Sequence, residues 1–169
     1  MSSFPSRAKV NLGLKVLNKR EDGYHNLHSL FVELDLSDEL LFTPASDFKL
    51  SADFTNDIQL PLNNTNLINQ AYSLMQQESK AIVSQYAIHL KKSIPIGAGL
   101  GGGSSNAAST IKALNELWKL NYSLNKLETL SAKLGADVPF FIRGGFQLAE
   151  GIGEKLTPQH DHALYGLHF

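Results

Sequence analysis

The chain has 169 residues, of which 43% are hydrophobic and 18% are charged, which is ordinary for a globular protein. Its 15 Lys and Arg residues nearly balance 16 Asp and Glu residues, and the formal net charge of -1 gives no indication of nucleic-acid binding. The absence of cysteine excludes disulfides, thiolate metal sites and cysteine nucleophiles.

The N-terminal residues lack the long apolar core of a signal peptide, and no apolar run reaches the length of a transmembrane helix. No cluster of Lys and Arg indicates binding to an anionic membrane surface. We therefore expect a cytoplasmic protein that has neither a membrane nor a nucleic acid as its partner.

Apolar and polar residues alternate over residues 8–16, which predicts a half-buried strand whose apolar side chains face the core. The opposite face of this strand carries Lys9 and Asn11, so both side chains can reach one site.

Further β segments follow along the first part of the chain. Residues 28–36 have the pattern of a second strand, and residues 37–39 that of a turn into the apolar residues 40–42. Residues 48–52 have the pattern of another short strand. The first part of the chain is therefore expected to be rich in antiparallel β structure.

Helical patterns dominate the next part. Asn64 or Thr65 can cap a helix that begins near Asn66. After a strand over residues 86–92, apolar residues recur at helical spacing over residues 104–118.

The last part contains one more helix and a hairpin. Ser123 can cap the helix, and Gly135 would close it. Residues 137–142 form a short apolar segment, and a hairpin is expected around residues 150–153. A β-rich first half followed by helices packed on the sheet predicts an α+β fold.

Residues 95–108 (PIGAGLGGGSSNAA) are rich in glycine and lie directly before a predicted helix. Glycine permits left-handed backbone conformations, which can turn several amide N–H groups toward one point. The macrodipole at a helix N-terminus also favours negative charge. This arrangement predicts a site for a phosphate group.

Three familiar phosphate loops do not fit this one. Gly97, Gly99 and Gly102 satisfy the dinucleotide-binding pattern, but the chain continues from helix to helix where a strand with an acidic residue should follow. Gly97 and Gly102 also have Walker A spacing, yet Gly103 stands where that motif needs lysine. The motifs that accompany a protein-kinase glycine loop are absent from the sequence. A loop that serves only tight packing is a further alternative, which the Gly-Ser-Ser sequence at a helix start disfavours.

Residues 95–108 resemble the phosphate-binding motif of the GHMP kinases, the superfamily of galactose, homoserine, mevalonate and phosphomevalonate kinases. The run of three glycines, two serines and an asparagine is similar to that of one family within it, the 4-diphosphocytidyl-2-C-methyl-D-erythritol kinases. Residues 7–12, 22–25 and 135–141 resemble three further motifs of that family. The resemblance covers roughly residues 5–158, and four ordered motifs are more specific than one.

The resemblance implies the N-terminal domain of a GHMP kinase, an α+β fold like domain 2 of ribosomal protein S5. It implies that the γ-phosphate of ATP is transferred to the 2-hydroxyl of 4-diphosphocytidyl-2-C-methyl-D-erythritol, in the non-mevalonate isoprenoid pathway. The expected cofactors are ATP and Mg²⁺, and the expected substrate is a small cytidine diphosphate derivative. Another small-molecule GHMP kinase is an alternative, which the Gly-Tyr-His turn at residues 23–25 disfavours.

The resemblance assigns catalysis to Lys9 and Asp137. Asp137 would accept or orient the proton of the substrate hydroxyl, while Lys9 would orient Asp137 and stabilise developing charge. Without the resemblance, Asp137 is also explained as a helix N-cap and Lys9 as a solvated strand lysine.

Substrate binding is assigned to Asn11, Tyr24 and His25. Tyr24 can stack on cytosine and His25 can hydrogen-bond the edge of the base, although Tyr24 is also explained as a hairpin tyrosine that covers the core. The serine hydroxyls at the start of the helix can bind phosphate or Mg²⁺. The ATP-binding residues that the resemblance implies are Asn66, Lys92, Pro95, Ile96, Gly97, Ala98, Gly99, Leu100, Gly101, Gly102, Gly103, Ser104, Ser105 and Asn106.

GHMP kinases have two domains, with the ATP and substrate cleft between them. We expect residues 1–150 to form the N-terminal ATP-binding domain and residues 151–169 to be the start of a truncated second domain. The later glycine-rich motif of the family is not found in this sequence. A nucleotide-binding chain without turnover is therefore another alternative.

Overall fold

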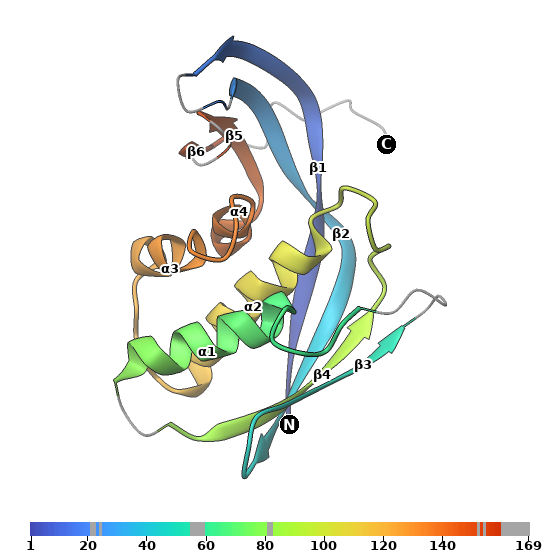
Figure 1. The fold of residues 1–169 in the computed structure, drawn as a ribbon, viewed down its shortest axis with the longest axis vertical. Coiled ribbons are helices and arrows are strands. Elements are labelled where there is room, and N and C mark those ends of the chain that lie inside the picture. The colour runs from blue at the N-terminus through green and yellow to red at the C-terminus, as the bar shows by residue number, and fades with distance from the viewer. Residues whose placement is uncertain are drawn as a thin grey trace.

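The computed structural model describes residues 1–20, 23, 25–54, 60–80, 83–151, 153 and 155–159. Within these residues a curved sheet carries helices on one of its sides (Figure 1). The strands are β1 (Ser2–Lys19), β2 (His25–Ala45), β3 (Lys49–Phe54), β4 (Gln85–Lys92), β5 (Phe146–Glu150) and β6 (Lys155–Pro158). The helices are α1 (Leu67–Ser79), α2 (Gly102–Leu117), α3 (Leu124–Ser131) and α4 (Val138–Arg143). The predicted α+β fold is confirmed.

The central strand of the sheet is β2. It is antiparallel to β1 along one edge, while its other edge pairs with β4 through residues 39–45 and with β5 through residues 29–32. β3 is parallel to β4, and β6 is antiparallel to β5. The sheet order is therefore β3-β4-β2-β5-β6, with β1 on the free edge of β2.

The turn predicted over residues 37–39 is wrong, because β2 continues through it. Asp38 lies opposite Ser6 of β1 and is only 1% exposed. Its carboxylate accepts hydrogen bonds from distant parts of the chain, which allows an acidic residue to occupy the interior of a strand.

The hydrophobic core lies between the sheet and the helices. In α2, Ala107, Ala108, Ile111 and Leu114 are fully buried at helical spacing, as the sequence predicted. Each fully buried Leu or Ile side chain stabilises the fold by roughly 1.5–3 kcal/mol. The largest fully buried side chains include Tyr72, Phe42, Phe140, Phe141, Leu40, Ile68, Met75, Ile88, Leu90, Ile94, Ile111 and Leu114.

The predicted burial of the apolar face of β1 holds only for its first half. Ala8 is fully buried, but Leu14 and Val16 are 57% and 58% exposed. The register of β1 against β2 shifts between Asn11 and Leu14, where Gly13 has a φ of 78°. The end of the β1–β2 pair that lies near β5 and β6 extends beyond the helices (Figure 1).

Two helix boundaries differ from expectation. The N-cap of α1 is Asn66, rather than Asn64 or Thr65, because the Asn66 side chain accepts a hydrogen bond from Ile68 N. The helix α3 ends at Ser131, before Gly135. Its predicted cap is confirmed, since Ser123 Oγ accepts a hydrogen bond from Lys126 N.

The strands after α4 form the predicted hairpin, in which Glu150 of β5 pairs with Lys155 of β6. β6 thus belongs to the same sheet as the rest of the described chain. The domain boundary at residue 150 stays a prediction, and residues 160–169 lie outside the described residues. Among the described residues, no helix is both long and apolar enough to cross a membrane.

Candidate active site

The glycine-rich loop connects β4 to α2. Gly97, Gly99 and Gly101 have φ values of 75°, 75° and 70°, a left-handed conformation that glycine adopts without strain. Gly101 is the N-cap of α2 and has no side chain to satisfy the first amides of the helix. The first helical hydrogen bond runs from Ser105 N to Gly101 O at 2.8 Å. The N–H groups just before Ser105 therefore suit an anion at the positive end of the helix.

The loop lies directly against β1 and α4. Lys9 N donates a hydrogen bond to Leu100 O at 3.0 Å. A Cβ atom at Gly101 would lie 2.7 Å from Phe141 Cζ and 3.1 Å from Lys9 Cγ. Only glycine therefore allows α2 to begin this close to Lys9 and to α4.

The side chain of Lys9 is buried at this junction and is 5% exposed. Its Nζ lies 3.5 Å from Asp137 Oδ2, and it donates to Asn11 Oδ1 at 2.6 Å. It also lies 4.7 Å from the centroid of the Phe31 ring. The prediction that Lys9 and Asn11 share one face of β1 is confirmed, and the interpretation of Lys9 as a solvated lysine is wrong.

Asp137 occupies the N-cap position of α4, but its side chain makes no capping hydrogen bond. The side chain is 41% exposed and faces Lys9. Asp137 therefore has the N-cap position that the sequence predicted, but its carboxylate does not cap the helix and is directed toward Lys9 instead. Its geometry is that of a carboxylate oriented by a cation and open to a ligand.

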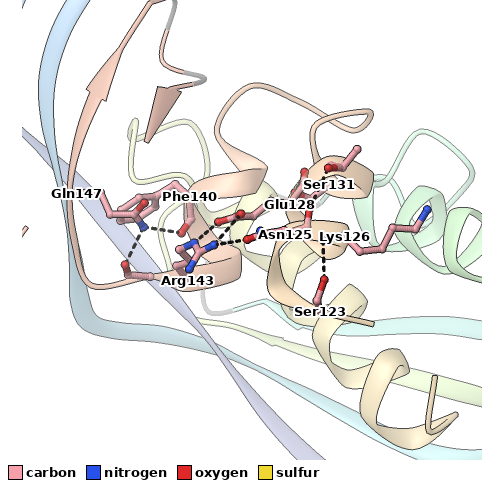
Figure 2. Close-up of polar contacts among 10 residues, drawn as sticks. Ser123, Asn125, Lys126, Glu128, Ser131, Phe140, Arg143 and Gln147 are labelled. Carbon is pink, nitrogen blue, oxygen red and sulfur yellow. Dashed lines mark hydrogen bonds and ion pairs between the residues drawn. The ribbon is translucent and has the colours of Figure 1, made fainter. Parts of the chain in front are cut away.

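Helix α4, which carries Asp137 at its start, is fixed to α3 by Arg143. Figure 2 shows the Arg143 guanidinium directed at Glu128 and Asn125 of α3. It donates to both carboxylate oxygens of Glu128 and to Asn125 Oδ1, the latter at 2.7 Å. Gln147 Nε2 of β5 donates to Phe140 O and Gly144 O at 3.2 and 2.8 Å, which connects the C-terminal end of α4 to β5 (Figure 2).

Two cations at the C-terminal end of α4, Lys112 packed against it and Arg143 within it, have shifted pKa values. Burial lowers the pKa of Lys112, an effect that the nearby Glu33 carboxylate opposes. Lys112 Nζ donates to Phe141 O at 2.8 Å, in the last turn of α4. Hydrogen bonding to Glu128 raises the pKa of Arg143. Positive groups near the C-terminus of a helix complement its dipole, so both residues help to keep α4 in place.

A buried polar network lies beneath the loop. Asp38 accepts hydrogen bonds from Lys92 Nζ at 2.7 Å and from Asn106 Nδ2 at 2.9 Å. Asn106 Nδ2 also donates to Ser6 Oγ, which donates to Ser105 Oγ, each at 2.9 Å. Ser6 and Asp38 were not predicted from the sequence as part of the site. One feature of the sequence indicates that Asp38 is buried: it lies close to the apolar residues 40–42.

This network changes the interpretation of three predicted ATP-binding residues. Lys92, Ser105 and Asn106 are 5%, 1% and 2% exposed. Their side chains point into the protein, so in this structure they shape the loop from beneath. Their direct contact with ATP stays a prediction.

Asn66 uses both ends of its side-chain amide as the cap of α1. Its Oδ1 accepts from Ile68 N at 2.9 Å, and its Nδ2 donates to Pro61 O at 2.8 Å. The start of α1 lies beside the start of α2, since a Cβ at Gly103 would be 3.7 Å from Leu67 Cδ1. Asn66 is therefore near the loop, and its contact with ATP also stays a prediction.

The predicted nucleobase site lies partly outside the described residues. Asp22 and Tyr24 are not described, and His25 is exposed at the start of β2, opposite Lys19. In the described part of the chain, no group of three or more His, Cys, Asp and Glu side chains is placed to hold a metal ion.

Residues 66–145 match the family model of the GHMP kinases N terminal domain. The chain is 45% identical over 160 residues to the 4-diphosphocytidyl-2-C-methyl-D-erythritol kinase of Pseudomonas fluorescens strain SBW25, covering 94% of this chain and 55% of the relative. It is 47% identical over 157 residues to the enzyme of that name from Acinetobacter baylyi, covering 93% and 56%.

A solved structure shows the same fold. The crystal structure of 4-(cytidine 5'-diphospho)-2C-methyl-D-erythritol kinase aligns with a TM-score of 0.79 and 43% identity, covering 94% of this chain and 55% of that one. The chain thus spans about half the length of the relatives it matches. The fold, the family model and the relatives agree that this chain contains a GHMP kinase N-terminal domain.

Proposed function

We propose that this chain is the ATP-binding part of a 4-diphosphocytidyl-2-C-methyl-D-erythritol kinase, a cytoplasmic enzyme of the non-mevalonate isoprenoid pathway. The observation that carries the proposal is the Lys9–Asp137 pair, 3.5 Å apart, at the point where the glycine-rich loop meets α4. The relatives of that name support the choice of substrate. Residues 1–150 form the ATP-binding domain in this proposal.

The reaction transfers the γ-phosphoryl group of ATP to the 2-hydroxyl of the substrate. The hydroxyl oxygen attacks the γ-phosphorus, Asp137 accepts the hydroxyl proton, and the bond from the γ-phosphorus to the bridging oxygen breaks to release ADP. Lys9 orients the Asp137 carboxylate and stabilises negative charge nearby. The amides at the start of α2 hold the phosphates.

The residues present fit Mg²⁺ only together with ATP. Mg²⁺ favours oxygen ligands, keeps several waters, and is commonly held by one or two protein groups plus substrate phosphates. Among the described residues beside the loop, Asp137, whose side chain is 41% exposed, and the partly buried Ser104 offer oxygen atoms as ligands. When bound, Mg²⁺ would neutralise phosphate charge.

The substrate side of the site is assigned to Asn11, Tyr24 and His25. Asn11 supports this because its side chain contacts Lys9 Nζ and its residue is exposed. In the proposal, Tyr24 stacks on the cytosine ring and His25 hydrogen-bonds the edge of the base.

The test is an ATP-dependent phosphorylation assay with 4-diphosphocytidyl-2-C-methyl-D-erythritol, comparing the chain with Asp137→Asn. We expect ADP and the phosphorylated product from the former, and a rate at least about 100-fold lower from the variant. Mevalonate and homoserine serve as control substrates and should give no product. Equal rates for the two proteins would contradict the role of Asp137, and product from a control substrate would indicate another GHMP kinase. ATP binding without turnover would indicate a nucleotide-binding chain.

A further inference from the structure

Asp38 is a fully enclosed carboxylate that no step of the proposed reaction uses. Its side chain is 0% exposed and forms an ion pair with Lys92. It is separate from the Lys9–Asp137 pair of the proposed active site. Its Oδ1 accepts from Ser93 N and Ile94 N, both at 2.8 Å. Its Oδ2 accepts from Lys92 Nζ at 2.7 Å and from Asn106 Nδ2 at 2.9 Å. Such a carboxylate is costly to bury, and these charge-assisted hydrogen bonds compensate for its lost hydration.

The four donors come from the two ends of the glycine-rich loop. Lys92, Ser93 and Ile94 are the residues from which the loop departs, and Asn106 lies in the first turns of α2, into which the loop runs. One carboxylate in the middle of β2 therefore fixes the distance between the two ends of the loop. Between those ends, Gly97 and Gly99 are loosely surrounded: a Cβ at either position would meet no atom within 4 Å outside the adjacent residues.

The same network reaches the strand that carries Lys9. Asn106 Nδ2 donates to Ser6 Oγ as well as to Asp38, and Ser6 Oγ donates to Ser105 Oγ. Ser6 is three residues before Lys9 in β1, and Lys9 N donates to Leu100 O of the loop. These hydrogen bonds therefore fix the positions of the loop, the start of α2 and β1 relative to one another.

Lys92 adds an electrostatic requirement. Its Nζ would be 2.9 Å from a Cβ at Gly102, so the ammonium lies beneath the first turn of α2. The N-terminus of a helix is itself positive, and a buried cation there is unfavourable unless an anion is close. The Asp38 carboxylate supplies that anion. Because this carboxylate is buried beneath the loop, it does not occupy the amides at the start of α2 that would bind a phosphate.

We propose that Asp38 is a positioning residue for the phosphate loop: it holds the two ends of the loop together, and balances the charge of Lys92, so that the amides at the start of α2 are arranged to receive a phosphate. This inference rests on the proposed nucleotide site, because it assumes that those amides bind ATP. The carboxylate acts through the backbone and makes no contact with the ligand.

The test uses Asp38→Asn, which keeps the shape of the side chain. The amide oxygen of the variant can still accept from Ser93 N and Ile94 N. Its NH₂ group, however, faces two donors, Lys92 Nζ and Asn106 Nδ2, so the link to α2 is lost and the charge that Asp38 supplies to Lys92 is removed.

The matched control is Tyr72→Phe, which also removes a buried hydrogen-bonding centre. Tyr72 hydroxyl accepts from Tyr86 N at 3.0 Å and donates to Gln85 Oε1 at 3.1 Å, at the end of β4 that is remote from the loop. A milder second variant is Ser6→Ala, which removes one link of the network and no charge.

Two measurements are made on the full chain: amide hydrogen exchange over residues 92–106, and affinity for AMP-PNP with Mg²⁺ by calorimetry. We expect Asp38→Asn to raise exchange in this segment selectively and to weaken AMP-PNP binding about tenfold. Ser6→Ala should shift both in the same direction by a smaller factor, of about threefold. Tyr72→Phe should raise exchange around α1 and the start of β4, with AMP-PNP affinity unchanged.

The inference is overturned if exchange over residues 92–106 rises no more in Asp38→Asn than in Tyr72→Phe, or if AMP-PNP binds Asp38→Asn as tightly as the parent chain. If Asp38→Asn does not fold, an unchanged AMP-PNP affinity in Ser6→Ala overturns it equally. If the parent chain itself does not bind AMP-PNP, the proposed function fails. The exchange comparison then still decides whether Asp38 orders the loop.

Discussion

The ammonium group of Lys9 lies 3.5 Å from the carboxylate of Asp137, although only the carboxylate is open to solvent. This asymmetry makes the two residues unequal as targets for substitution. Removing Asp137 leaves a cation that is 5% exposed, with Asn11 as its remaining polar side-chain partner in the part of the chain that the structure describes. Removing the charge of Lys9 leaves a carboxylate that water can hydrate.

We therefore predict that Lys9→Met separates stability from catalysis. Methionine keeps the apolar stem beside Gly101, so the free energy of unfolding should change by less than about 1.5 kcal/mol. The rate of phosphoryl transfer should fall at least about 100-fold, because Asp137 loses the group that orients it. Urea unfolding and steady-state kinetics measure the two effects, with the exposed Lys49→Met as the control. A rate within a few-fold of the parent chain would show that Lys9 has no part in the reaction.

Asn66 offers a way to separate helix capping from nucleotide binding. Asn66→Ala removes the acceptor for Ile68 N and should lower the free energy of unfolding by about 1 kcal/mol, whereas Asn66→Ser keeps a capping oxygen and should lower it less. Ser123→Ala, which removes the cap of α3, is the matched control for stability. If Asn66 also contacts ATP, both Asn66 variants weaken ATP binding in calorimetry and Ser123→Ala does not. Unchanged ATP affinity in both Asn66 variants would leave Asn66 with a structural role alone.

Local sequence patterns predicted the glycine-rich loop, the strand that carries Lys9 and the helix that begins the phosphate site. These features depend on neighbours within one turn of helix or a few strand residues, such as the alternation that places Lys9 beside Asn11. The position of Asp137 beside Lys9 came only from the resemblance, because α4 and β1 are remote in sequence.

The network beneath the loop was not predictable from local patterns. Asp38 bonds to Lys92, 54 residues away, and Ser6 bonds to Asn106, 100 residues away. Local periodicity does not show which polar residues will be buried together, so Asp38 looked like part of a turn. Local periodicity likewise did not show that the Ser105 hydroxyl accepts a hydrogen bond from buried Ser6.

A pH-dependent contribution to stability is predicted for Glu78, at the end of α1. Hydrogen bonds from Lys133 at 3.1 Å and Lys126 at 3.3 Å lower the pKa of Glu78 below its usual value of 4.5. Because the folded-state pKa is the lower one, this stabilisation is present above pH 4.5 and is lost as the pH falls through the folded value. Glu78→Gln should therefore lower the urea midpoint at pH 6 and leave it unchanged near pH 2.5, with the difference reduced by salt. A constant difference across this pH range would exclude the ion pairs as its cause.

Gly101 and Gly99 provide a test of how closely the loop packs against the catalytic pair. Both have a left-handed backbone, with φ values of 70° and 75°, so an alanine at either position is strained by about 1–2 kcal/mol. A Cβ at Gly99 would meet nothing within 4 Å, whereas one at Gly101 would lie 2.7 Å from Phe141 Cζ and 3.1 Å from Lys9 Cγ. Gly101→Ala should therefore be less stable than Gly99→Ala by about a further 1–3 kcal/mol.

The clash at Gly101 should also displace Lys9 from Asp137, so Gly101→Ala should lose phosphoryl transfer more severely than Gly99→Ala. Urea unfolding and the phosphorylation assay, run on both variants, measure these differences. Equal stability of the two variants would mean that Phe141 and Lys9 move aside without strain, and that the start of α2 is not held against them as tightly as the structure indicates.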